Sequence, residues 1–271
     1  MSNETSTGKG SSLFVAIVFP LVLIISVMIY MFVLGDPSNF ENGDPIKGHP
    51  IAENPGKLYG TIYKGGFIVP ILISVNLIVI VFSVERFITL SRAKGKGRIE
   101  TFLGKVRQFL AKDQVEDAVA VCDEQQGSVA NVMRSGLQKY KLVLHDASHD
   151  KETRMQAVKQ ELEEATALEL PMLSKNLVIL STCASVSTLL GLIGTVLGMI
   201  RAFSALATAG TPDATALSTG ISEALINTAL GITGSCVAII AFNYFSTKID
   251  AITHGIDEAG FSVSQTLATH K

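Results

Sequence analysis

Glu223 is the acidic residue whose surroundings point most clearly to ion chemistry in this chain. It lies in the run Ile221-Ser222-Glu223-Ala224-Leu225, near one end of a long apolar segment. A carboxylate at or within a membrane span is costly, so it usually faces a cavity or a partner and takes part in function. The alternative is that Glu223 lies at the membrane interface and extends its side chain into water. We predict that Glu223 belongs to an ion pathway.

Small and hydroxyl-bearing residues line two apolar segments that are separated by a short turn. In the earlier segment they recur at helical steps, at Ser181, Ser185, Thr188, Thr195 and Gly198. The later segment has a similar stripe of Thr228, Gly231, Ser235, Ala238 and Phe242, with Asn227 and Gly234 on an adjoining face. Residues at such steps share one helix face. Small residues let membrane helices approach closely, and hydroxyls hydrogen-bond across helices or line a wet path.

Glycines in the same segments favour close helix packing, and we assign that role to Gly191, Gly194, Gly198 and Gly231. By itself a G-x-x-x-G motif indicates ordinary packing more readily than a pathway. Proton transport usually needs a titratable group in the path. Since no expected span places a carboxylate at mid-depth, a proton-carrying residue is expected to belong to another subunit.

Membrane-spanning helices must position these residues. About 20 mostly apolar residues cross the hydrocarbon core as a helix, and four segments are long enough: Leu13–Leu34, residues 67–85, Leu177–Phe203 and Ile221–Phe245. The first could instead be a cleavable signal peptide, but its apolar run is longer than a typical h-region and lacks a basic start. A short turn at Gly210-Thr211-Pro212-Asp213 predicts that residues 173–246 form an antiparallel hairpin.

Basic residues set the expected orientation, because Lys and Arg close to a span mark the cytoplasmic side. They follow the second span at Arg86, Arg92, Lys94, Lys96, Arg98, Lys105 and Arg107. Residues 86–172 are therefore predicted to form a helical cytoplasmic domain. Residues 1–12 and a C-terminal helix at 247–271 are expected on the same side, with an irregular periplasmic loop at 35–66 that is rich in turn residues. The predicted fold is an all-α polytopic membrane protein with four transmembrane helices.

Composition and motifs exclude several other functions. Charged residues make up 17% of the chain, against roughly 25% in soluble domains, and the net charge of −2 argues against nucleic-acid binding. The sequence contains no nucleotide-binding motif and no nucleophile–base pair, so we expect that the protein is not an enzyme and binds no cofactor. We expect no metal site, because His145 and His149 lack a third ligand. Three unpaired cysteines are interpreted as packing residues, at Cys122, Cys183 and Cys236.

Two motifs of the hairpin resemble those of the ExbB/TolQ/MotA proton-channel family, and those of ExbB and TolQ most of all. The first is Gly191-Leu192-Ile193-Gly194-Thr195-Val196-Leu197-Gly198, followed by Ala202-Phe203, which resembles G-L-x-G-T-V-x-G. The second is Ile221-Ser222-Glu223-Ala224-Leu225-Ile226-Asn227-Thr228-Ala229-Leu230-Gly231, which resembles I-x-E-A-L-x-x-T-A-x-G. Phe242-Asn243 resembles the aromatic–Asn pair that ends this helix. The resemblance covers about Leu177 to Ser246.

The resemblance implies a homo-pentameric ring whose hairpin helices line a central pore. A single-span partner of the ExbD/TolR/MotB kind would occupy the pore as a dimer and carry the proton on a membrane Asp. Thr195 and Thr228 would face that Asp, and Glu223 would be the matching acid of the ion pathway. The ring would lie among the lipids of the bacterial inner membrane with both termini in the cytoplasm, and would pass force to a TonB-like protein.

The chain also departs from ExbB and TolQ. Thr188 and Val237 stand where these proteins commonly have proline, and Leu197 where Trp is common. Leu13–Leu34 is an additional span, since ExbB and TolQ have three, whereas MotA has four but its hairpin motifs fit less well. We therefore expect an ExbB-like pore-forming subunit, driven by the proton motive force, that energises outer-membrane transport. The alternatives are a motility or TolQ-type envelope stator and, in another class, a membrane scaffold that conducts nothing.

Overall fold

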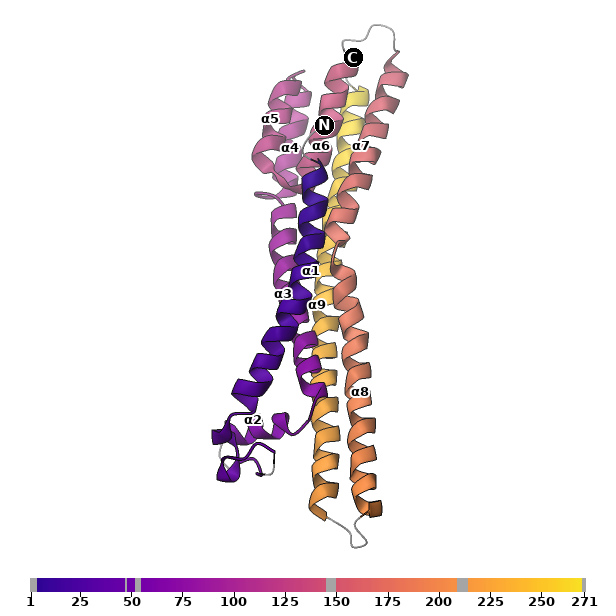
Figure 1. Cartoon of the computed structure of the whole chain (residues 1–271). Coiled ribbons are helices and arrows are strands. Elements are labelled where there is room, and N and C mark those ends of the chain that lie inside the picture. Colours follow the sequence, from indigo (N-terminus) through magenta and orange to yellow (C-terminus); the bar gives the residue numbers. More distant parts are fainter. Residues whose placement is uncertain (1–3, 47, 52–54, 145–149, 209–213, 270–271) are drawn as a thin grey trace. The chain divides into compact units, whose positions relative to one another are not determined.

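The chain is folded into helices almost throughout, as Figure 1 shows for a computed structural model that describes residues 4–46, 48–51, 55–144, 150–208 and 214–269. Within these residues the only extended pairing is an isolated bridge between Phe40 and Pro50. The all-α fold class predicted from the sequence is therefore confirmed. The turn predicted at Gly210–Asp213 lies outside the described residues.

Four helical stretches of the described chain are long and apolar enough to cross a membrane. They are Leu13–Leu34, Ile68–Ala93, Lys151–Ser204 and Leu217–Leu267. Only helices and closed barrels satisfy their own backbone hydrogen bonds in hydrocarbon. Three of the four predicted spans fall within one of these stretches, and the second, residues 67–85, overlaps Ile68–Ala93 in all but its first residue. The chain is therefore a multi-pass membrane protein.

Two compact units divide the chain. Unit 1 comprises Met1–Ser83 and Ile179–Ala241, and unit 2 comprises Val84–Val178 and Phe242–Lys271. Three helices contribute residues to both units: α3 (Ile68–Ala93), α8 (Leu177–Thr208) and α9 (Ala214–Thr269). Since α9 contains no proline and no break, the fourth span and the described part of the predicted C-terminal helix, residues 247–269, form one helix.

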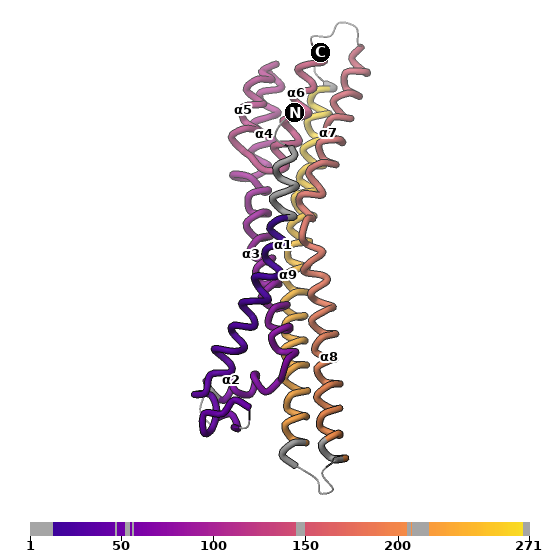
Figure 2. Tube along the Cα trace, in the orientation of Figure 1, coloured from indigo at the N-terminus to yellow at the C-terminus, as the bar shows by residue number. Residues whose placement is uncertain are grey.

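Unit 1 begins with α1 (Glu4–Met28), which continues as a π-helix at Ile29–Leu34. Two aromatic residues of α1 contact α3, because the rings of Phe14 and Phe19 lie 5.9 and 6.2 Å from the ring of Phe82. In this unit α8 and α9 run side by side in opposite directions (Figure 2). The buried side chains of α3, α8 and α9 form the core that positions the candidate site.

The segment between the first two spans is more ordered than its turn-rich sequence predicted. It contains two 3₁₀ turns, Pro37–Asn39 and Glu41–Gly43, and the helix α2 (Gly56–Tyr63). Its aromatic residues hold it together: Tyr30 stacks on Tyr63 with 4.6 Å between ring centroids and donates a hydrogen bond of 3.1 Å to the Tyr63 carbonyl. Long-range aromatic contacts of this kind are not visible in local turn propensity, which is why the prediction of an irregular loop was wrong.

Unit 2 contains four helices of its own: α4 (Ile99–Leu110), α5 (Val115–Gln125), α6 (Gly127–Leu144) and α7 (Lys151–Ser174). Neighbouring helices in this series pack on one another around the fully buried side chains of Val106, Ala118, Met133, Leu137 and Val158. The break between α5 and α6 falls at Gly127, whose φ is +82° and whose added Cβ would lie 2.5 Å from the Ala93 carbonyl oxygen. Only glycine tolerates both conditions.

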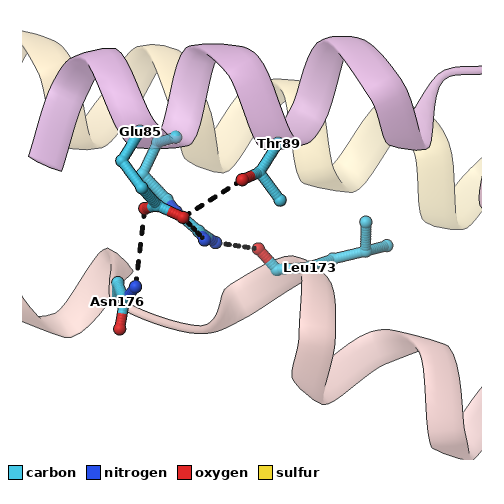
Figure 3. A network of polar contacts seen from close by, with 5 residues as sticks. Glu85, Thr89, Leu173 and Asn176 are labelled. Carbon is cyan, nitrogen blue, oxygen red and sulfur yellow. Dashed lines mark hydrogen bonds and ion pairs between the residues drawn. The ribbon is translucent and has the colours of Figure 1, made fainter. Parts of the chain in front are cut away.

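A buried ionic network within unit 2 holds the junction where α7 ends and α8 begins (Figure 3). Arg86, only 2% exposed, donates from Nη1 to the Leu173 carbonyl at 3.1 Å. The Glu85 carboxylate accepts from Arg86 at 2.6 and 2.7 Å and from Asn176 at 3.4 Å. A charge inside an apolar helix needs such partners, and Arg86 at the same time satisfies a carbonyl that the end of α7 leaves free.

The cysteines differ from one another in their environments. All three are free thiols: Cys122 and Cys183 are buried, as predicted, whereas Cys236 is exposed on the chain. In unit 2, burial raises the pKa of Cys122 to about 12, with the nearby Asp123 carboxylate adding to the rise.

Because the thiolate is the reactive form, Cys122 should resist maleimide labelling at pH 7.5 in the folded protein and react fully after unfolding. Peptide mass spectrometry of native and denatured samples measures this difference. Equal labelling rates in the two samples would contradict the buried, protonated state of this thiol.

Candidate functional site

The candidate site lies in unit 1, where α8 and α9 cross through two glycines. A Cβ added to Gly191 would lie 3.2 Å from the Gly231 Cα, and one added to Gly231 would lie 2.8 Å from the Gly191 Cα. The backbones therefore touch at the crossing, as small residues permit in membrane helices. Gly198 makes a similar approach farther along, since its Cβ would lie 2.8 Å from the Gly220 carbonyl oxygen.

Gly231→Ala should separate the two helices, because its Cβ would lie 2.6 Å from the Ser187 carbonyl oxygen, a backbone atom that cannot move aside. We expect a loss of stability of about 1–3 kcal/mol, the usual cost of overpacking. Gly104→Ala is the control: nothing lies within 4 Å of its added Cβ, so it should stabilise α4 by about 0.5–1 kcal/mol. Thermal unfolding in detergent measures the Tm of both variants. Equal changes in Tm would contradict the contact at the crossing.

Two threonines meet beside this crossing. The Oγ1 atoms of Thr195 on α8 and Thr228 on α9 share a hydrogen bond in which either hydroxyl can be the donor. Both hydroxyls also lie near the Gly191 carbonyl oxygen, at 3.2 Å for Thr195 and 3.5 Å for Thr228. Both side chains are half-buried. The fold thus brings together two of the three residues that the sequence assigned to an ion pathway.

Glu223, the third of these residues, lies elsewhere in the site. It precedes Thr228 by five residues, or about 7.5 Å along the helix axis at 1.5 Å per residue, and points away from the threonine pair. Its carboxylate pairs with Arg201 of α8, while its side chain is only 10% exposed. Arg201 also lies over the Phe67 ring at 5.7 Å. From the sequence alone, the position of Arg201 near the end of the third expected span indicates an interface anchor, so its pairing with a buried acid was not predicted.

The turn that precedes α3 covers Glu223. A Cβ added to Gly66, whose φ is +80°, would lie 2.5 Å from a Glu223 carboxylate oxygen. One helical turn along α9, Asn227 is fully buried and donates from Nδ2 to the Gly65 carbonyl at 2.9 Å. Two adjacent glycines therefore let the backbone lie directly on the acid and the amide. Neither glycine was singled out from the sequence, where the pair looks like an ordinary turn.

The face of α8 that packs on α9 also differs from the predicted stripe. Its buried residues are Ala184, Ser187, Gly191, Gly194, Gly198 and Ala202, whereas Ser181 and Ser185 are exposed. The difference arises because the glycines, which allow the closest approach, decide which face meets the partner helix. On α9 the predicted residues Gly231, Ser235 and Ala238 are buried, and so are Asn227 and Gly234 from the adjoining face.

A metal centre receives no support from the described part of the chain, which contains no group of three or more His, Cys, Asp or Glu side chains that could hold an ion. His145 and His149 lie outside the described residues. The chemistry that the site offers is therefore that of hydroxyls, one amide and one paired carboxylate.

Residues 124–258 match the model of a family described as the MotA/TolQ/ExbB proton channel family. The matched range includes Thr195, Arg201, Glu223 and Thr228. It leaves out α1, α2 and α3, and with them the additional first span and the glycine turn that covers Glu223.

Individual relatives agree with this match over parts of the chain. The Tol-Pal system protein TolQ of Pseudomonas aeruginosa is 32% identical over 124 residues, which are 46% of this chain and 54% of the relative. The biopolymer transport protein ExbB of Pseudomonas putida is 25% identical over 160 residues, or 59% of this chain and 48% of the relative. A putative biopolymer transport protein ExbB-like 3 of Synechocystis is 41% identical over 86 residues, 31% of this chain and 41% of the relative. The chain thus spans about half the length of the curated relatives it matches.

Proposed function

Because the chain belongs to the MotA/TolQ/ExbB proton channel family, we propose that it is the pore-forming subunit of a membrane motor driven by the proton motive force. The observation that carries this proposal is the hydrogen-bonded pair of Thr195 and Thr228. The pair lies within the matched range and joins the two helices of the hairpin. The motor would energise transport across the outer membrane, as the ExbB-like relatives suggest.

The threonine pair suits a proton pathway because a hydroxyl both donates and accepts hydrogen bonds. It can donate to a carboxylate and accept from a carboxylic acid, so it can solvate a titrating acid in both of its protonation states. In the proposed mechanism the two hydroxyls exchange their mutual hydrogen bond for bonds to an Asp of a single-span, ExbD-like partner. That Asp carries the proton, since Glu223, the acid of α9 near the pair, is already bound to Arg201.

Glu223 would serve the same path from one end of α9. Its pairing with Arg201 lowers the cost of burying the charge. The pair provides a polar group between α8 and α9 near the end of the hairpin where the two helices are connected. The proposed assembly is a ring of five copies, with the α8–α9 hairpins around a pore that holds a partner dimer. The exposed apolar side chains of Leu192, Val196 and Leu225 would face neighbouring copies, the partner or lipid.

The proposed location is the bacterial inner membrane. The basic residues from Arg86 onward support a cytoplasmic position for residues 86–172, by the positive-inside rule. Both termini would then be cytoplasmic and residues 35–66 periplasmic. A TonB-like protein would receive the force on the periplasmic side.

Affinity purification of the tagged chain from its native membrane tests the proposal, with mass photometry of the complex and mass spectrometry of its components. We expect five copies together with a small single-span protein that has one acid in its span. A monomer, or a ring without such a partner, would contradict the motor and favour a scaffold that conducts nothing.

A TolQ-type envelope role is the second candidate, because TolQ of Pseudomonas aeruginosa matches over 124 residues. Deletion of the gene separates the two roles: loss of energised uptake with an intact envelope selects the ExbB-type role, and leakage or division defects with intact uptake select the TolQ type. A defect confined to motility would instead indicate a motility stator.

A further inference from the structure

Three buried side-chain atoms of unit 1 lack a hydrogen-bond partner among the described residues: Ser83 Oγ on α3, Ser187 Oγ on α8 and Asn227 Oδ1 on α9. Two of them, on Ser187 and Asn227, belong to the α8–α9 pair. Both residues are fully buried within a single copy of the chain, so a neighbouring copy or lipid cannot satisfy them. Buried polar groups in folded proteins almost always have a partner. Where no protein group supplies one, an ordered water usually does.

These two atoms lie on either side of the Gly191–Gly231 crossing, and each belongs to a residue that packs against a glycine of the opposite helix. Asn227 lies over Gly194 of the opposite helix, and Ser187 lies close to the Cα of Gly234. Each is one helical turn from the crossing, on opposite sides of it. Each of these two side chains therefore packs against a glycine, which has no side chain of its own.

Further polar groups stand near each atom. A Cβ built on Gly234 would lie 2.5 Å from Ser187 Oγ and 2.7 Å from Asn76 Oδ1, so these two oxygens are at most about 5.2 Å apart. Two hydrogen bonds of about 2.8 Å each span up to about 5.6 Å, and one water can therefore bridge the oxygens. Asn76 is held in place by its own hydrogen bond of 2.8 Å from Nδ2 to the Leu72 carbonyl.

The second atom has a polar neighbour on its own helix. Asn227 Oδ1 and the Glu223 carboxylate are both acceptors, and they belong to buried residues one turn apart on the same face of α9. Two acceptors cannot bond to each other, but a water has two hydrogens and can donate one to each. The Gly65–Gly66 turn, which contacts both residues, closes this place from outside.

We propose that the core of unit 1 is a binding site for two ordered water molecules, one bridging Ser187 and Asn76 and the other bridging Asn227 and Glu223. The site is separate from the threonine pair, since Asn227 and Thr228 are adjacent residues whose side chains point about 100° apart around the helix. It is a property of one folded copy and does not rest on the proposed ion transport.

Thermal unfolding of Ser187→Ala in the purified, detergent-solubilised protein tests the first water. If the hydroxyl binds water, its removal deletes hydrogen bonds and lowers Tm, by about 3 °C for a chain of this size. If the hydroxyl is dry, removing an unsatisfied group raises Tm. Ser74→Ala is the comparison, because Ser74 is also buried on α3 and its hydroxyl donates to the Ile71 carbonyl at 2.7 Å; the loss of this hydrogen bond should lower Tm as well. A Tm of Ser187→Ala equal to or above that of the original protein, with Ser74→Ala lowered, would overturn the first site.

A cryo-electron microscopy map that resolves ordered waters on backbone carbonyls of α8 and α9 tests both positions directly. We expect peaks within about 3 Å of Ser187 Oγ and of Asn227 Oδ1. A map that shows waters elsewhere in these helices and none at these two atoms would overturn the proposal.

Discussion

Replacing Thr195 or Thr228 by valine should leave the complex assembled and reduce its proton conduction by roughly ten- to hundredfold. Valine keeps the volume of threonine but removes the hydroxyl, so the packing at the crossing is retained while the shared hydrogen bond is lost. Under the proposed mechanism a titrating acid then loses one of the two hydroxyls that donate to it in its ionised state. Proton flux into proteoliposomes that contain the purified complex with its partner measures the loss.

Thr233→Val is the matched control for this experiment. Thr233 lies on the same helix, is exposed, and donates its hydroxyl to the Ala229 carbonyl at 2.8 Å, so its loss should change conduction little. The proposal fails if Thr195→Val and Thr228→Val conduct like the original protein. If both variants fail to assemble, the pair has a packing role instead.

Breaking the pair of Arg201 and Glu223 should reduce both stability and conduction. Arg201→Gln leaves the nearly buried Glu223 carboxylate without its counter-charge. Because the Arg201 side chain is itself 49% exposed, we expect the free energy of unfolding to fall by about 2 kcal/mol. This loss lies between the values for breaking surface pairs and buried pairs. Glu223→Gln removes the acid and should impair conduction at least about tenfold, with less effect on ring formation.

A double-mutant cycle measures how much of these losses comes from the pair itself. The combined Arg201→Gln/Glu223→Gln protein should be more stable than Arg201→Gln alone, because no unpaired charge is left, yet it should remain impaired in conduction. Lys159→Gln is the control: this exposed residue lies 3.9 Å from Glu163, and a surface pair contributes less than about 1 kcal/mol. Additive stability losses would show that Arg201 and Glu223 act independently, and unchanged conduction in Glu223→Gln would remove this acid from the pathway.

The sequence by itself determined the fold class and the number of spans. Hydrocarbon forces the backbone of each span to satisfy its own hydrogen bonds, so an apolar run of sufficient length is enough to locate a helix. The two hairpin motifs, which contain Thr195, Glu223 and Thr228, also indicated the family before any helix was placed. The Gly127-Ser128 pair also predicts a break between two helices of residues 86–172, and φ is positive at Gly127.

The tertiary structure alone decided which side chains meet. Asn227 reaches the Gly65 carbonyl from 162 positions away in the sequence, and Arg201 reaches Glu223 from 22 away. Such contacts depend on how each helix is rotated about its axis. That rotation is fixed by where backbones can touch, here at Gly191 and Gly231, and periodicity alone placed the α8 stripe on a different face. The same close approach buried Ser187 and Asn227, whose polarity the sequence displays but whose burial only the packed helices reveal.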